Sequence, residues 1–373
     1  MKNRLESLDV LRGFDLFFLV VLAKLSHRLE DAIDAPWYQP ISEFFTHKTW
    51  EGFSPWDLVM PLFMFMAGIT IPFSMEKYRQ YGFSSSLLRR LLRRFALLWL
   101  LGMACQGNLL ALDPEHIYLF SNTLQAIAVG YLFSVIIFLH TRWKSQLAIT
   151  IALLLAFWTA MEFLSIGGFG GGDYTAHGNL AEGIDRMVLG RFRDAAQVEN
   201  GKVVFAEWYT YTWILSSIGF VSTVLTGMLT GQLLKGSLNE QQKTGILVAA
   251  GAGMVALGWM WNIVHPVIKH IWTSSMVLVS SGYCILLMAL FYYWIDVKGH
   301  RQNLTFLKVY GMNSITAYTV TNVVSFSSVS HSLFDGLEQF TGDYFPVLIQ
   351  ASNVTIIFLI LFFMYKHKIF LRA

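Results

Sequence analysis

About ten apolar stretches, each close to the length of a membrane-spanning helix, constrain this chain more than any other feature of its sequence. A helix of about 20 mainly apolar residues crosses the hydrocarbon core of a bilayer, because it satisfies its backbone amides internally. Hydrophobic residues make up 55% of the 373 positions and charged residues only 14%. The sequence therefore predicts an all-α, polytopic transmembrane helical bundle. The expected spans are residues 9–26, 56–75, 95–112, 121–139, 147–165, 213–233, 245–264, 273–295, 304–325 and 347–365.

The basic residues predict the orientation of these spans. Lys and Arg stay preferentially on the cytoplasmic side during insertion, and most of the 27 in this chain fall in inner loops if the N-terminus is cytoplasmic. Both termini are therefore predicted to be cytoplasmic. The first stretch carries Asp9, Arg12 and Asp15 and lacks a small-residue cleavage pattern, so we expect a retained helix and not a signal peptide. The net charge of +3 is dispersed over short loops, which gives no support to nucleic-acid binding.

The connections between the stretches predict one transmembrane domain over residues 1–373, with a vestibule on its outer side. Two outer connections, 27–55 and 166–212, are too long to be simple turns. The glycine-rich run 167–172 lacks the preceding strand and the following Lys-Ser/Thr of a phosphate loop, so a flexible loop is expected there. Cys105 and Cys284 both fall inside predicted spans without ligand spacing, so we expect neither a disulfide nor a metal site.

A histidine and an aspartate lie at the entrance of the second stretch, and we predict that both are catalytic. The imidazole of His47 can take a proton from an attacking amine or hydroxyl, or can itself accept an acyl group. Asp57 at a span entrance is costly unless it is paired, and a carboxylate can orient an imidazole. The alternatives are a surface histidine that makes ordinary hydrogen bonds and an aspartate that caps the second helix.

A second polar and aromatic cluster is predicted at the outer junction of the seventh and eighth stretches. Side chains that hydrogen-bond beside aromatic faces are suited to sugars, whereas Trp at a membrane interface needs no ligand. Both interpretations stay open from the sequence. With two residues close to His47, the residues predicted to bind substrate are Trp50, Glu51, Asn262, His265, Lys269, Trp272 and Ser274.

Arginines near the predicted cytosolic side and amides inside the spans are the candidates for binding a cofactor. Residues 87–94 alternate pairs of Leu and Arg, so a helix there would carry an arginine stripe that anchors on anionic lipid or binds the phosphates of a nucleotide-type cofactor. Amides inside spans need partners from another helix or from a ligand. Arg12 is expected to pair with Asp9 and Asp15, and a phosphate contact is its alternative role. The candidate cofactor-binding residues are Arg12, Arg90, Arg93, Arg94, Asn122, Gln125 and Asn313.

Five segments in this order resemble the heparan-alpha-glucosaminide N-acetyltransferase family and its bacterial relatives. They are residues 4–13, 47–68, 122–128, 269–296 and 311–314. The resemblance covers nearly the whole chain, and it implies a multi-span enzyme that takes acetyl from cytosolic acetyl-CoA and delivers it to the amino group of a terminal glucosamine across the membrane. It also implies that His47 is the family's essential histidine.

The resemblance further implies a location and leaves several points open. The shorter form without an additional N-terminal luminal region is shared with bacterial-type relatives, so we expect the bacterial inner membrane and a periplasmic amino sugar or oligosaccharide acceptor. The rival functions are a proton-coupled amino-sugar transporter and a sugar O-acetyltransferase. Direct transfer with His47 as general base and an acetyl-histidine intermediate are both open. So is the oligomeric state, for which a homodimer is one option.

Overall fold

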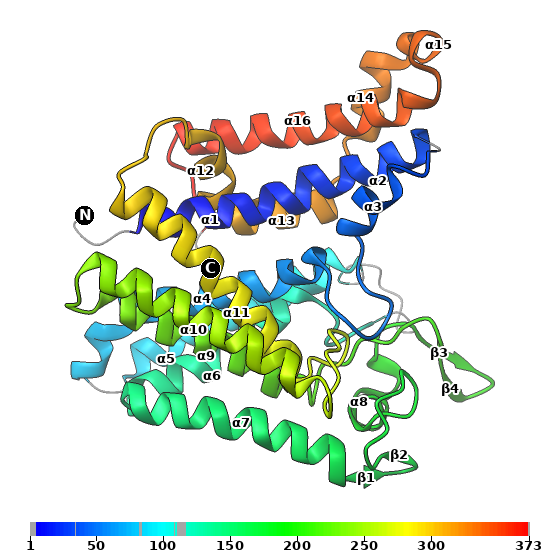
Figure 1. Cartoon of the computed structure of the whole chain (residues 1–373). Helices are drawn as coiled ribbons and strands as arrows, with labels where there is room; N and C mark the ends of the chain where they lie inside the picture. The colour runs from blue at the N-terminus through cyan, green and yellow to red at the C-terminus, as the bar shows by residue number, and fades with distance from the viewer. Residues whose placement is uncertain (1–4, 34, 82–83, 108, 110–116, 372–373) are drawn as a thin grey trace. The chain divides into compact units, whose positions relative to one another are not determined.

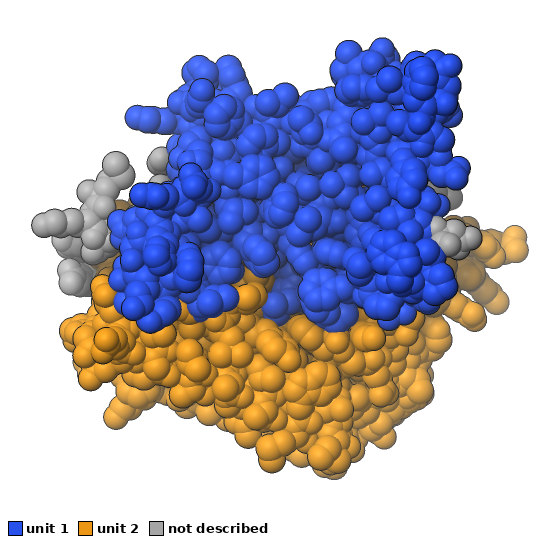
Figure 2. Space-filling view, turned by 45° about the horizontal axis from the view of Figure 1, so that its top comes forward, with its two compact units in different colours: residues 1–47, 54–59, 290–373 blue, residues 48–53, 60–289 orange. Residues whose placement is uncertain are grey.

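The computed structural model describes residues 5–33, 35–81, 84–107, 109 and 117–371, and these residues are mainly helical (Figure 1). They form two compact units, coloured separately in Figure 2. Unit 1 comprises residues 1–47, 54–59 and 290–373, and unit 2 comprises residues 48–53 and 60–289. The chain thus passes from one unit to the other directly after His47.

Unit 1 is built from the two ends of the chain. Its elements are α1 (Glu6–Phe17), η1 (Phe18–Leu22), α2 (Ala23–Ala32), α3 (Gln39–Phe44), η2 (Pro55–Leu58), η5 (Tyr292–Val297), α12 (Thr305–Met312), α13 (Ser314–Val323), α14 (Ser327–Phe334), η6 (Asp335–Leu337), α15 (Glu338–Thr341), η7 (Gly342–Tyr344) and α16 (Phe345–Lys366). The helices α1 and α12 pack with their backbones in contact, because a Cβ built on Gly311 would lie 1.9 Å from the carbonyl oxygen of Asp9. Glycine at this crossing is therefore a steric requirement.

Unit 2 holds the central part of the chain. Its elements are α4 (Val59–Tyr81), α5 (Ser85–Cys105), α6 (Thr123–His140), α7 (Trp143–Phe163), β1 (Ser165–Ile166), β2 (Phe169–Gly170), α8 (Leu180–Leu189), η4 (Gly190–Phe192), β3 (Ala196–Glu199), β4 (Lys202–Phe205), α9 (Ser217–Lys235), α10 (Glu240–Trp261) and α11 (Ser274–Phe291). Each strand pair is a two-stranded antiparallel hairpin. The helices α4 and α9 approach through Gly68 and Gly227, as is common between membrane helices.

Each predicted span overlaps a helix within the described residues. Seven stretches there are long and apolar enough to cross a membrane: 55–79, 123–140, 143–163, 217–235, 240–261, 274–297 and one within 327–366. The other three expected spans have identifiable reasons for falling outside this group. The 9–26 stretch carries charged residues, α5 has four arginines in its N-terminal half, and 304–325 is broken between α12 and α13 at Asn313. Residues 108 and 110–112 at the end of the expected third span, and Arg4, lie outside the described residues.

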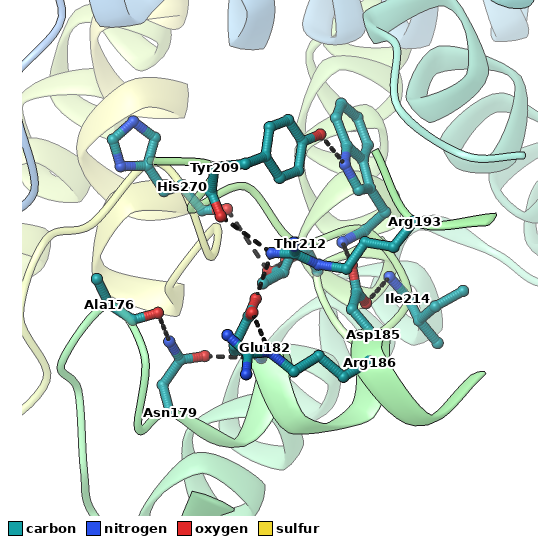
Figure 3. Close-up of polar contacts among 12 residues, drawn as sticks. Ala176, Asn179, Glu182, Asp185, Arg186, Arg193, Tyr209, Thr212, Ile214 and His270 are labelled. Carbon is teal, nitrogen blue, oxygen red and sulfur yellow. Dashed lines mark hydrogen bonds and ion pairs between the residues drawn. The ribbon is translucent and has the colours of Figure 1, made fainter. Parts of the chain in front are cut away.

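The long connection 166–212 folds into a small layer of its own. It contains both hairpins and α8, and a buried ionic network holds it together (Figure 3). The carboxylate of Glu182 accepts from Arg186 Nε and from Arg193 Nη2, each at 2.6 Å. Asp185 accepts the backbone N–H groups of Trp213 and Ile214 at 2.8 and 2.9 Å, which ties α8 to the segment that leads into α9.

Candidate functional site

The predicted catalytic pair is assembled in unit 1. The Nδ1 atom of His47 lies 2.8 Å from Oδ1 of Asp57. The Asp57 side chain is 1% exposed, whereas that of His47 is 38% exposed. The carboxylate is therefore shielded from water, and the imidazole is reachable from outside the protein. A buried carboxylate bonded to one ring nitrogen fixes the tautomer of the imidazole and the direction in which that nitrogen points.

Ser54 holds the other oxygen of the same carboxylate, and sequence reasoning missed it. Its backbone N–H donates to Asp57 Oδ2 at 2.9 Å, and its hydroxyl lies 3.0 Å from that oxygen. This is a capping box at the start of η2, with Pro55 in the first helical position. The Ser-Pro-Trp-Asp spacing was the available signal. Asp57 thus caps the helix and orients His47 at once, so the two interpretations of this residue are compatible.

The segment that follows His47 is anchored within unit 2 by three contacts. The indole N–H of Trp50 donates to the carbonyl of Tyr174 at 2.8 Å, and its ring packs against His270 at 5.5 Å between centroids. Glu51 forms an antiparallel bridge with Ile268. The next residue, Gly52, donates its N–H to the carbonyl of Val267 at 2.8 Å. These contacts hold the backbone at Glu51 in place, while the Glu51 side chain is exposed.

His265 has a structural environment in unit 2. Its Nε2 accepts the backbone N–H of Ser274 at 3.0 Å, so the proton lies on Nδ1, which bonds the Tyr174 hydroxyl at 2.8 Å. Burial lowers the pKa of His265 to about 3. A neutral imidazole with both nitrogens engaged is suited to holding the junction and is unsuited to exchanging protons.

The remaining residues predicted to bind sugar are mostly turned inward. The Trp272 ring is buried and donates to Thr223 Oγ1 at 3.1 Å, and the Ser274 hydroxyl donates to the carbonyl of Leu154 at 2.7 Å. Asn262 accepts the N–H of Val267. Lys269 is nearly buried with its Nζ 6.0 Å from the Tyr211 ring centroid. Their participation in binding stays a prediction.

The arginines of α5 are not equivalent. Arg90 and Arg93 are exposed, and Arg90 donates to the Tyr78 hydroxyl. Arg94 is turned toward α6, where its guanidinium carbon lies 3.7 Å from the ring centroid of Tyr131. The buried Nε of Arg94 and the buried hydroxyl of Tyr131 have no hydrogen-bond partner within the described part of the chain. Of the three candidate arginines in α5, Arg94 therefore has a guanidinium held in place by an aromatic ring and an Nε donor available for a ligand.

The other residues predicted to bind the cofactor differ in their partners. Gln125 and Asn122 form the capping box of α6, which uses most of their bonding capacity. Arg12 lies 3.9 Å from Asp9, as the sequence predicted for that pair. Asn313 donates weakly to Val309 and Leu361, while its buried Oδ1 has no hydrogen-bond partner among the described residues. No group of His, Cys, Asp and Glu suited to a metal ion occurs within these residues.

Comparison with known proteins gives one consistent result. Residues 4–169 match the sequence model described as heparan-alpha-glucosaminide N-acetyltransferase, catalytic. The chain is 26% identical to heparan-alpha-glucosaminide N-acetyltransferase of Mus musculus over 421 aligned positions, which cover 99% of this chain and 60% of the mouse protein. It is 26% identical to the Homo sapiens protein of the same name, covering 92% of this chain and 54% of the human protein. The chain thus spans little more than half the length of these relatives.

Proposed function

We propose that this chain, which belongs to the heparan-alpha-glucosaminide N-acetyltransferase family, transfers the acetyl group of cytosolic acetyl-CoA to the amino group of a glucosamine-type sugar across the membrane. The observation that carries the proposal is the bond between exposed His47 and buried Asp57. Both residues lie inside the region that matches the family's catalytic model.

The proposed topology has ten spans with both termini in the cytosol, in a bacterial inner membrane. The seven strongly apolar helical stretches support this arrangement, and the other three expected spans are helical as well. The basic helix α5 then lies toward the cytosol, where acetyl-CoA is available. The outer connections 27–55 and 166–212 face the periplasm, and the folded layer around α8 supplies part of a vestibule there.

Acetyl transfer to an amine requires a nitrogen with a free electron pair. Because Nδ1 of His47 donates to Asp57, Nε2 is the atom that accepts a proton. The amine nitrogen attacks the thioester carbon, a C–N bond forms, and Nε2 removes one N–H proton. The tetrahedral intermediate then collapses with cleavage of the C–S bond, and the thiolate takes a proton from the imidazolium or from water. Asp57 stabilises the transient imidazolium.

The co-substrate acetyl-CoA carries phosphates, and Arg94 fits such a group best among the candidates. Its guanidinium plane is fixed by Tyr131, and its Nε is an unused buried donor. A planar fork of donors suits phosphate oxygens. Asn313 offers an unused acceptor. On the acceptor side, Trp50 and Glu51 are the residues best placed by the anchored segment to meet a sugar.

The test uses purified protein in proteoliposomes with acetyl-labelled acetyl-CoA on one side and glucosamine on the other. We expect labelled N-acetylglucosamine, and a loss of about two to four powers of ten in rate for His47→Ala. His140→Ala, at the exposed end of α6, is the matched control and should retain wild-type rates. Undiminished transfer by His47→Ala would refute the assignment of the base.

The same preparation separates the rival functions. An acetyl group that hydroxylamine removes from the product would identify O-acetylation, because esters are cleaved and amides are not. Glucosamine uptake without acetyl-CoA would identify a transporter. Quenched-flow sampling before acceptor is added would detect labelled His47 if an acetyl-histidine forms, and that adduct would overturn direct transfer.

A further inference from the structure

A chain of aromatic rings leads from the first helix to His47. The imidazole of His47 packs on the indole of Trp56, with centroids 5.8 Å apart and planes inclined by 38°. The indole also packs on Phe18, at 5.5 Å between centroids and 41° between planes. Phe18 in turn packs on Phe44 and Phe45, at 5.9 and 5.1 Å. All of these residues lie in unit 1.

We propose that Trp56 and Phe18 are positioning residues for His47: the indole restrains the plane of the imidazole, and Phe18 restrains the indole. This inference rests on the proposed function, because it assigns a task to residues that touch the base but not the reacting atoms. Nothing in the sequence reasoning had given Trp56 or Phe18 a role.

The hydrogen bond to Asp57 does not by itself fix the plane of the imidazole. The bond at Nδ1 fixes where that nitrogen points, but it leaves the ring plane to be set by what packs against the ring. Contact with the indole face restricts this plane, because ring pairs prefer a narrow set of offsets and inclinations. The ring face also attracts a cation, so it stabilises the imidazolium that forms when the base has taken its proton.

Two short helical turns, η1 and η2, set the positions of the Phe18 and Trp56 rings. Phe18 is the first residue of the π-helical turn η1, and π-helical turns are rare and frequently lie at functional sites. Trp56 immediately precedes Asp57 in η2, whose start is fixed by the Ser54 capping box and by Pro55. The same short helix therefore presents both the carboxylate and the indole to His47.

Polar contacts of unit 1 also lie around His47. Asp57 is bonded to it directly. His27 on α2 bonds the carbonyl of Phe45 at 3.2 Å, and Glu43 on α3 accepts the Thr46 hydroxyl through its backbone carbonyl. None of these polar bonds involves the side chain of Trp56 or Phe18, so an effect of their substitution on His47 can be attributed to the rings.

The experiment compares Trp56→Leu, Trp56→Phe and Phe18→Leu in the acetyl-transfer assay. Trp56→Leu should lower kcat on the order of 10-fold with little change in KM for either substrate, because misorientation of a base acts on the chemical step. Trp56→Phe restores a ring and should recover most of the rate, and Phe18→Leu should fall between them. Trp37→Leu removes a largely exposed tryptophan of unit 1 that packs on Tyr38 and is the matched control.

A second measurement does not depend on catalysis. Diethylpyrocarbonate acylates neutral imidazoles, and mass spectrometry of the His47 peptide gives the rate. Uncovering the ring face should raise that rate several-fold in Trp56→Leu and Phe18→Leu but not in Trp37→Leu, with thermal unfolding confirming that each variant is folded. Wild-type kcat together with a wild-type modification rate in Trp56→Leu would overturn the proposal. Faster modification in a protein without acetyl transfer would support positioning while rejecting the proposed function.

Discussion

The carboxylate of Asp57 gives one oxygen to His47 and the other to Ser54, with Oδ1 2.8 Å from Nδ1 of the imidazole. Ten positions separate His47 from Asp57 in the chain, yet a capped helix start and a short connection bring them into a hydrogen bond. Because Oδ2 is held by Ser54, Oδ1 has a defined direction, and the position of Nδ1 of the imidazole follows from that of the helix.

Replacement of Asp57 by Asn is expected to abolish most of the acetyl-transfer activity. The amide introduced by Asp57→Asn has two possible orientations. If its NH₂ group faces Ser54, it meets the backbone N–H donor there. If its NH₂ group faces Nδ1 of His47, it forces the imidazole into the wrong tautomer. Loss of two to four powers of ten in kcat is expected, on the order of that in histidine–aspartate enzymes. Steady-state kinetics of the purified variant provides the measurement.

Ser54→Ala is the control for this substitution. It removes the hydroxyl but keeps the backbone N–H donor to Oδ2, so it should cost about 1 kcal/mol of stability as a lost helix cap and little of kcat. Activity of Asp57→Asn within threefold of wild type would mean that Asp57 serves only as a cap.

Arg94 and Arg93 are neighbours with opposite environments, which makes them a matched pair. Arg94→Gln should raise KM for acetyl-CoA about 10-fold or more, because a charge-assisted bond to phosphate is typically worth 1.5–3 kcal/mol. Arg93→Gln should leave KM near the wild-type value, since its side chain is exposed. Isothermal titration with CoA checks the same difference without turnover. Equal effects of the two substitutions would favour a lipid-anchoring role for the whole stripe.

The buried carboxyl group of Asp185 should make the free energy of unfolding of the segment around α8 depend on pH. Burial raises its pKa to about 7, against the smaller opposing effects of the backbone N–H groups of Ile214 and Trp213. Since the carboxyl group has a pKa near 3.9 when unfolded, the folded state binds the proton more tightly. Its contribution is complete below pH 4 and is lost as the pH rises toward 7, up to about 4 kcal/mol in total.

Asp185→Asn should therefore flatten the pH dependence of the thermal unfolding temperature between about pH 4 and pH 7. The absolute temperature is less informative, because the amide cannot accept both backbone N–H groups and the variant is destabilised at every pH. Asp173→Asn is the control, because Asp173 is an acidic residue of the same outer connection that accepts the nearby backbone N–H of Thr175. A slope in Asp185→Asn as steep as in wild type would contradict the expectation.

The helical framework was predictable from the sequence, because an apolar stretch of about 20 residues crosses a bilayer as a helix. The proximity of His47 to Asp57 followed from the short distance along the chain and from the chemistry of both residues. The break at Asn313 and the folded segment around α8 were not predicted. Contacts such as that of Trp50 with Tyr174 join residues 124 positions apart. No local pattern encodes such a pairing, and the inward-turned state of Trp272 was hidden for the same reason.

The crossing of α4 and α9 gives a test of the fold itself. A Cβ at Gly227 would lie 2.0 Å from the carbonyl oxygen of Phe65, and this backbone atom cannot move aside without separating the helices. Gly227→Ala should therefore destabilise the protein by about 1–3 kcal/mol, the usual cost of overpacking, or more. Gly245 in α10 is the matched position, because a Cβ there meets nothing within 4 Å. Gly245→Ala should leave stability unchanged or raise it by up to about 1 kcal/mol, since alanine is the better helix former. Thermal unfolding of both variants in the same detergent compares the two effects, and equal unfolding temperatures would show that α4 and α9 do not pack through Gly227.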